Sequence, residues 1–447
     1  MKIKNSKNFI LVIAIILITI PYLSISLGND EPFTMGIIRH NYHQLLYLTS
    51  LDIHPPLYFI FLKAFLSITT FWTTNIFIKI LFSRLLSLIF TIISFVFIKK
   101  ILMYLKINIH LISSLLIFLI VPLELGLSQE ATNIRMYSLT IMLFSIQMYY
   151  TIKYIDSLKK KHLLLVFIVV SASLYTQYVS GFISGIYLLL CSANLFRERK
   201  IKSALSIIIL GTTSLISFIP WLPYFLKQMS YQQNPGSISL MFKFIIEVMT
   251  ITLIFIFPYI SCKNILGNKY KYVFSIPLSI ILLTIFISIA RFVISGGMIS
   301  IRYLSPILVP YTFISIILFI YSDKKRNNIL SFIIILFISI CMGISLFRQL
   351  DRYFIPQFSF ISKFDKIKRI NKSEINVKKE HLNTYYWDQG AGGGGNAIYL
   401  LSINKKISDN NYMNTYTTLG NGNPKLFKAI FPNIKHFTDI NTNKQKH

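Results

Sequence analysis

Long apolar runs recur along this chain, and they constrain its fold more than any other feature. Each is about 20 residues long, which is the length that a helix needs to cross the hydrocarbon core of a bilayer. The composition agrees, since 54% of the residues are hydrophobic and the mean hydropathy is +0.61. A soluble chain of 447 residues would need a more polar surface where it meets water. The sequence therefore predicts an all-α polytopic membrane protein.

The basic residues indicate how the chain is oriented rather than what it binds. In a soluble protein a net charge of +29 would suggest nucleic acid as a partner. Here most of that charge lies in short loops, where it orients helices in the membrane, so no nucleic-acid partner is expected. The three cysteines, Cys191, Cys262 and Cys341, lie in or beside apolar segments without metal-ligand spacing. We expect them to be packing residues.

The first apolar segment, residues 8–27, follows three lysines and lacks a small-residue cleavage site. It is predicted to be a retained helix with its N-terminus in the cytoplasm, which puts Asp30 and Glu31 outside. The stretch 54–72 is ambiguous, because it is apolar enough to span but opens on two prolines and carries Lys63 in its middle. Counting it as a span would reverse the side of every later loop.

The loop charges decide between these two topologies. If residues 54–72 lie along the membrane surface, the predicted cytoplasmic loops carry 20 Lys and Arg residues and the outer loops before the tail carry 8. The positive-inside rule favours this arrangement, which contains eleven spans and puts the C-terminus outside. The predicted spans are 8–27, 82–98, 108–124, 136–152, 163–177, 179–195, 204–222, 239–261, 272–291, 303–321 and 329–347.

Two domains follow from this topology. Residues 1–347 form the transmembrane domain, in which residues 28–81 make a large first extracytoplasmic loop with amphipathic helices. Residues 348–447 are polar and are predicted to form a small extracytoplasmic α/β segment or a partly ordered tail. The glycine-rich stretch 390–395 matches G-x-G-x-x-G but has no βαβ context, so we interpret it as a flexible loop.

The acidic residues gather in one part of the chain. Up to Phe347 there are nine, and five of them fall between the first apolar segment and residue 130. Those five are Asp30, Glu31, Asp52, Glu124 and Glu130. Carboxylates close to a bilayer are costly, so a cluster facing one compartment suggests a functional site. The predicted site is an acidic pocket over the outer membrane face that acts on a lipid-linked substrate.

Three outer-face stretches contain the residues that suggest a reaction. They are N-D-E at residues 29–31, D-I-H-P-P-L-Y at 52–58, and S-Q-E at 128–130 followed by R-M-Y-S-L at 135–139. In this order they resemble the GT-C glycosyltransferases of the family 39-like branch, which includes bacterial relatives of protein O-mannosyltransferases and aminoarabinose transferases. The resemblance covers about residues 8–310. One departure is that residues 132–134 separate the Gln-Glu-Ala element from Arg-Met-Tyr, which the family usually joins directly.

The resemblance implies transfer of a sugar from a polyprenyl phosphate to an acceptor at the outer face, by an inverting single displacement. Asp30 is the candidate catalytic base, since activating a hydroxyl needs a positioned carboxylate. Glu31 is the second catalytic candidate, and it would orient Asp30, raise its pKa or hold a divalent ion. The alternative for both is that they only end the first helix in a solvated loop.

The remaining candidates are expected to bind substrate. They are His54, Glu130, Arg135, Tyr137 and Arg302. Arg302 opens a span on the outer side, where its fork suits a lipid phosphate, with Arg84 and Arg291 as further phosphate candidates. A divalent metal is a candidate cofactor, with Glu31, Glu130 and His54 as candidate ligands.

Purely structural roles remain as alternatives for several of these residues. His54 would then only precede a rigid helix start, Asp52 would cap that helix, and Arg302 would be an interfacial anchor. Aromatics such as Tyr175 and Tyr178 at an outer turn are more often interface residues than a sugar platform.

The predicted function is thus a cell-membrane hexosyl- or pentosyltransferase with a lipid-linked donor and a glycan, lipid or protein acceptor. The rivals are a flippase or transporter of lipid-linked sugars and a polymerase or ligase of surface glycans. A transporter favours repeated halves and broken mid-membrane helices, which the sequence does not show. A polymerase or ligase would carry its large outer loop late in the bundle, whereas here the first outer loop is large.

Overall fold

The structure is a computed structural model of the whole chain. It describes residues 31–106, 132–229, 241–242, 245, 271–295, 301–310, 384–388, 412–416 and 436–440. Several predicted features lie outside these residues, namely Asp30, Glu124, Glu130, the glycine-rich stretch, and the spans 8–27, 108–124 and 329–347. Most of the predicted span 239–261 lies outside them as well.

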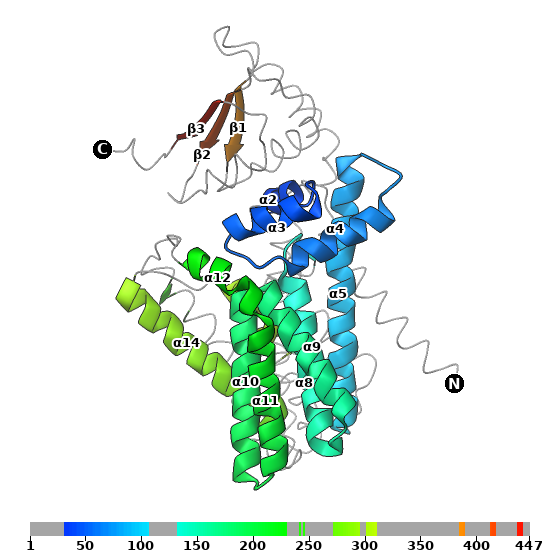
Figure 1. Cartoon of the computed structure of the whole chain (residues 1–447), viewed down its shortest axis with the longest axis vertical. Helices are drawn as coiled ribbons and strands as arrows, with labels where there is room; N and C mark the ends of the chain where they lie inside the picture. Colours follow the sequence, from blue (N-terminus) through cyan, green and yellow to red (C-terminus); the bar gives the residue numbers. More distant parts are fainter. Residues whose placement is uncertain are drawn as a thin grey trace, which may run out of the picture.

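Five long helices pack into a bundle. They are α5 (Ile76–Tyr104), α8 (Tyr137–Ser157), α9 (Lys160–Thr176), α10 (Tyr178–Arg197) and α11 (Ile201–Ser217). α5 packs on α8, α8 on α9, and both α9 and α11 on α10, so neighbours in sequence are neighbours in space (Figure 1). One apolar cluster runs through the bundle, with Phe144, Tyr187 and Cys191 fully buried in it. The expectation that Cys191 is a packing residue agrees with this position.

Among the residues that the structure describes, four stretches are long and apolar enough to cross a membrane. They are 78–104, 178–197, 201–228 and 271–290. These stretches overlap predicted spans and agree with a multi-pass membrane protein. The predicted spans 136–152 and 163–177 correspond to α8 and α9, which are helical but fall outside this set of four. α9 is 17 residues long, and α8 carries both Lys153 and Asp156 near its end.

Three short helices lie across one end of the bundle (Figure 1). They are α2 (Glu31–Ile37), α3 (Tyr42–Leu51) and α4 (Leu57–Thr69). α4 has 13 residues, which at 1.5 Å each makes about 20 Å, short of the roughly 30 Å of a bilayer core. This length favours the interpretation of residues 54–72 as a surface helix rather than a span.

A second apolar cluster joins these short helices to the bundle. It contains Met35 and Leu45 of α2 and α3, Tyr58 and Leu62 of α4, and Tyr137 at the start of α8. Burial on this scale holds α2, α3 and α4 against the helix ends, since each fully buried large side chain contributes about 1.5–3 kcal/mol. These three helices therefore form a packed layer over one end of the bundle. We call this end of the bundle the site end.

The opposite end carries the basic turns. The ammonium of Lys153 lies 4.3 Å from the ring centre of Tyr104, near the last turns of α8 and α5. The carboxylate of Glu198, in the turn after α10, accepts a hydrogen bond from the ammonium of Lys200 at 2.9 Å. It also forms an ion pair with Lys271 at 3.6 Å. Turns that the sequence assigns to the cytoplasm thus meet at one end, away from α2, α3 and α4. The position of these basic turns agrees with the loop bias of the sequence.

The remaining elements follow α11. They are the 3₁₀ turn η2 (Ile219–Trp221), α12 (Leu222–Met229), the π-helical turn η3 (Lys271–Ser275), α14 (Ile276–Ser295) and the 3₁₀ turn η4 (Ile301–Leu304). α12 lies at the site end and contacts α3. η4 brings Tyr303 against the second apolar cluster.

The C-terminal segment contains three strands, β1 (Thr384–Asp388), β2 (Tyr412–Tyr416) and β3 (His436–Ile440). They pair in parallel in the order β1-β2-β3, with Thr384 opposite Tyr412 and Tyr412 opposite His436. Parallel neighbours need long crossover connections, and 23 and 19 residues separate these strands in sequence. The α/β character of this segment and its boundary at residue 347 stay predictions, because the crossovers lie outside the described residues.

Candidate functional site

A buried ion pair ties α2 to α5 at the site end. The two terminal guanidinium nitrogens of Arg84, Nη1 and Nη2, donate to the two carboxylate oxygens of Glu31, each at 2.9 Å. The backbone N–H of Ile134 donates to the same carboxylate at 2.8 Å, and Arg84 also donates to the carbonyl of Thr132 at 3.1 Å. Both side chains are nearly excluded from solvent. Two-point pairing of this kind is the strong form of the interaction.

This geometry favours a positioning role for Glu31. Its two oxygens are engaged by one arginine and one backbone N–H, which together fix the segment before α8 against α2 and α5. The pairing also corrects the expectation that Arg84 is a phosphate ligand, since its guanidinium is committed to Glu31 and Thr132. Residues 132 and 134 supply the backbone groups that this pair holds.

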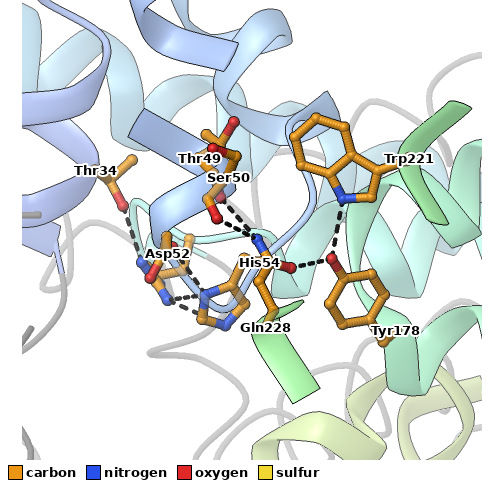
Figure 2. A network of polar contacts seen from close by, with 9 residues as sticks. Thr34, Thr49, Ser50, Asp52, His54, Tyr178, Trp221 and Gln228 are labelled. Atoms are coloured by element: carbon orange, nitrogen blue, oxygen red, sulfur yellow. Dashed lines mark hydrogen bonds and ion pairs between the residues drawn. The ribbon is translucent and has the colours of Figure 1, made fainter. Parts of the chain in front are cut away.

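A second polar chain lies beside this pair. His54 Nδ1 is 3.1 Å from Asp52 Oδ2, and Arg135 Nη2 is 3.3 Å from both ring nitrogens of His54. Arg135 Nη1 donates to the hydroxyl of Thr34 at 3.2 Å, which ties the chain to α2 (Figure 2). Nδ1 of His54 faces both the Asp52 carboxylate and the Arg135 guanidinium, so the imidazole bridges these two side chains.

Asp52 does not cap α4, so the alternative that it is only a helix cap is wrong. Its backbone N–H closes the end of α3 on Leu48 and Thr49, and Pro56 precedes α4 without a side-chain capping bond. The carboxylate turns toward His54 instead. Burial alone would raise the pKa of Asp52, but His54 and Arg135 outweigh burial and hold that pKa below its usual value. Asp52 is therefore an ionised partner of His54 at neutral pH.

Tyr58, the last residue of the D-I-H-P-P-L-Y stretch, is fully buried in the first turn of α4. Burial raises the pKa of its phenol well above the ordinary value. Glu31 adds to that rise, whereas Arg84 and Arg135 oppose it, which places the phenol within reach of all three charges. Tyr58 is thus a neutral group between the ion pair and the histidine chain.

Arg302 reaches the same region from η4. Its guanidinium carbon lies 5.7 Å from the ring centre of Tyr137, the first residue of α8. The ring of Tyr303 lies 6.2 Å from the same tyrosine. A guanidinium at this distance over a tyrosine face is held by the ring quadrupole, worth about 0.5–1 kcal/mol at an exposed site. Arg302 and Arg135 thus flank the start of α8.

A further network at the site end was not expected from the sequence. The amide of Gln228, on α12, donates to the backbone carbonyls of Thr49 at 2.9 Å and Ser50 at 3.3 Å. The hydroxyl of Tyr178 donates to the Gln228 amide oxygen and accepts from the indole of Trp221 at 3.0 Å (Figure 2). This network holds α12 and the start of α10 to the end of α3. No motif marks Gln228, so only its surroundings reveal it.

The described residues do not fit a metal site. Within them, no three His, Cys, Asp or Glu side chains are grouped to hold an ion. Glu31 faces the guanidinium of Arg84 and His54 faces that of Arg135, so each candidate ligand already has a cation beside it. Glu130, the third candidate, lies outside the described residues.

The structure thus brings five of the predicted site residues to one end of the bundle. They come from four separate stretches and are Glu31, His54, Arg135, Tyr137 and Arg302. Asp30 immediately precedes Glu31, but neither Asp30 nor Glu130 is described. The side chain of Arg291, on α14, is not described either. Tyr175 and Tyr178 pack on Phe218, and Tyr178 belongs to the Gln228 network rather than to an exposed belt.

No protein-family model matches this chain, and no curated protein matches it either.

Proposed function

We propose that the chain is a GT-C-type membrane glycosyltransferase. It would take a hexosyl or pentosyl group from a polyprenyl-phosphate donor and pass it to a glycan, lipid or protein hydroxyl. The active site would lie at the extracytoplasmic face of the cell membrane, with the C-terminal segment on the same side.

One observation carries this proposal. Residues from the three motif stretches and Arg302 meet at the site end, opposite the end of the bundle that carries Lys153, Lys200 and Lys271. The positive-inside rule assigns those basic turns to the cytoplasm, which leaves the site end outside. Polyprenyl-phosphate sugars present their head groups at a membrane surface, where such a site would meet them.

The proposed reaction is a single displacement. The acceptor oxygen attacks the anomeric carbon, the bond from that carbon to the phosphate oxygen breaks, and the lipid phosphate leaves with the bonding electrons. Asp30 takes the acceptor proton as general base. Arg84 holds Glu31, the residue that follows Asp30 in the sequence, at two points. Arg302 neutralises the leaving phosphate, for which its fork geometry is suited.

Turnover of a labelled donor in membranes tests the proposal. Asp30→Asn should lower transfer by about 10²–10⁴-fold, because it removes the base and keeps the shape. Asp156→Asn is the matched control, since Asp156 is an exposed acid at the other end of α8. Wild-type turnover in Asp30→Asn would assign the base elsewhere. Absence of any transfer by the wild-type chain, with lipid-linked sugar moved across the bilayer instead, would favour the transporter.

Arg302 provides a second test within the same assay. Arg302→Ala should weaken capture of the lipid phosphate, and Arg302→Lys should restore only part of it, since an ammonium lacks the two-point fork. Equal donor affinity in all three proteins would show that Arg302 is an interfacial anchor packed on Tyr137.

A further inference from the structure

A separate cavity lies at the site end, away from the residues just described. Its volume is about 280 Å³, and it opens between the end of α2, the C-terminal half of α4 and the start of α5. Its lining runs along α4 from Lys63 to Thr70, whereas His54 precedes the other end of that helix. Since liquid water occupies about 30 Å³ per molecule, the cavity has room for a hydrated phosphate group.

The lining of this cavity is basic. Three cationic side chains contribute to it, Arg39 from the turn after α2, Lys63 from α4 and Lys79 from α5, and none of its lining residues is acidic. Lys63 donates to the backbone carbonyl of Ile38 at 3.1 Å, a partner without charge. Burial and the nearby charge of Lys79 lower the pKa of Lys63, and burial lowers that of Arg39. Three like charges around one cavity form a site that an anion would stabilise.

One edge of the cavity is apolar and open. Phe71 lines it and is 81% exposed, and the neighbouring side chains Ile68 and Trp72 are 74% and 60% exposed. Leu66 forms the wall beneath them. Exposed aliphatic and aromatic side chains at the end of an apolar surface helix are suited to the boundary between head groups and hydrocarbon. The cavity therefore joins a cationic interior to a surface that fits lipid chains.

We propose that this cavity binds the phosphate head group of a membrane lipid. Arg39, Lys63 and Lys79 contact the phosphate oxygens, and the lipid chains lie along Ile68, Phe71 and Trp72. Bound lipid would fix the C-terminal half of α4 on the membrane and hold the first outer loop over the bundle. The proposal concerns lipid binding alone, so it stands or falls independently of the glycosyltransferase reaction.

Lipid binding by the purified full-length chain tests this. Phosphatidic acid and a diacylglycerol with the same chains are titrated separately and counted by native mass spectrometry. The wild-type chain should retain phosphatidic acid in preference to diacylglycerol. Lys63→Gln and Arg39→Gln should each weaken phosphatidic acid binding about tenfold, the effect of one lost charge-assisted hydrogen bond. Lys63→Arg keeps the charge and should stay within about threefold of wild type.

Lys227→Gln is the matched control. Lys227 is an exposed lysine of α12 at the same end of the bundle, outside the cavity lining. Its removal should leave phosphatidic acid binding unchanged. An equal loss of phosphatidic acid binding in Lys227→Gln and Lys63→Gln would overturn the proposal that the cavity is the binding site, and would attribute binding to general surface charge. Equal retention of diacylglycerol would overturn phosphate recognition, and inorganic phosphate bound as tightly as phosphatidic acid would overturn the lipid as the occupant.

Discussion

At the scale of single residues, the site end is organised by two arginines that have different partners. Arg84 is paired at two points with Glu31, and Arg135 lies between Thr34 and His54. A buried ion pair adds little net stability over apolar packing, but removing one partner leaves an uncompensated charge. The pair therefore specifies how α2, α5 and the segment before α8 meet.

Arg84→Met should destabilise the protein by about 3–5 kcal/mol, because it leaves the Glu31 carboxylate buried and unpaired. Denaturant unfolding in detergent measures this. The exposed pair between Lys200 and Glu198 supplies the control, and Lys200→Met should cost about 0–1 kcal/mol. The double variant Glu31→Gln with Arg84→Met should recover most of the loss. A double variant as unstable as Arg84→Met alone would contradict the charge argument.

The contact between Asp52 and His54 predicts that the stability of the protein depends on pH. The pKa of Asp52 lies below its usual value, so its contribution to stability is present in full above the unfolded-state pKa of about 3.9. That contribution is lost as the pH falls through the lower folded-state pKa. Melting temperatures of wild type and Asp52→Asn should therefore differ by a constant margin near neutral pH and converge below about pH 4. A margin that persists at low pH would mean that the carboxylate charge is not what His54 and Arg135 stabilise.

At the scale of helices, close packing of α9 against α10 depends on one glycine. A Cβ added at Gly181 would lie 2.6 Å from a methyl carbon of Leu174 and 3.1 Å from the Leu174 Cα. The methyl group can move, but the backbone of α9 cannot move without disturbing its other contacts. Small residues allow such approaches between membrane helices, where packing rather than water drives association.

Gly181→Ala should therefore cost about 1–3 kcal/mol, the range for overpacking a filled core. Gly185, one turn later on α10, has nothing within 4 Å of an added Cβ. Gly185→Ala makes the same chemical change without the clash and should be neutral or slightly stabilising, since alanine is the better helix former. Thermal unfolding of both variants in detergent compares them directly. Equal shifts would show that α9 and α10 can separate at no cost.

At the scale of the whole molecule, the two ends of the bundle differ in the short helices that cover them and in the turns that they carry. Short helices and the cavity lie at the site end, and basic turns lie at the other. An orientation with the site end outside puts the basic turns after α8 and α10 in the cytoplasm, as the positive-inside rule favours, and the opposite orientation would put them outside.

Cysteine labelling in intact cells tests this orientation. In a background with the native cysteines replaced by alanine, a reporter at His43 on α3 should react with an impermeant reagent. A reporter at Lys160, at the start of α9, should react only after permeabilisation. Both positions are exposed, so access depends on the compartment alone. Labelling of Lys160 from outside would reverse the topology and exclude an extracytoplasmic site.

The sequence by itself determined the class of the molecule and the extent of many of its elements. Hydropathy is a local property and bilayer thickness is fixed, so α5, α10, α11 and α14 could be located from apolar length alone. Charge in the loops is local too, and it predicted that residues 54–72 do not span. The residues Glu31, His54, Arg135, Tyr137 and Arg302 could be named because their motifs are short and contiguous.

Only the tertiary structure decided which side chains meet. Glu31 and Arg84 are 53 residues apart, Glu31 and Ile134 are 103 apart, and Gln228 and Thr49 are 179 apart. Such pairs depend on which helix ends become neighbours, and no local pattern encodes that. For the same reason the sequence offered Arg84 as a phosphate ligand and Asp52 as a helix cap. In the fold, desolvation makes each buried charge take the partner that packing puts within reach, which is Glu31 for Arg84 and His54 for Asp52.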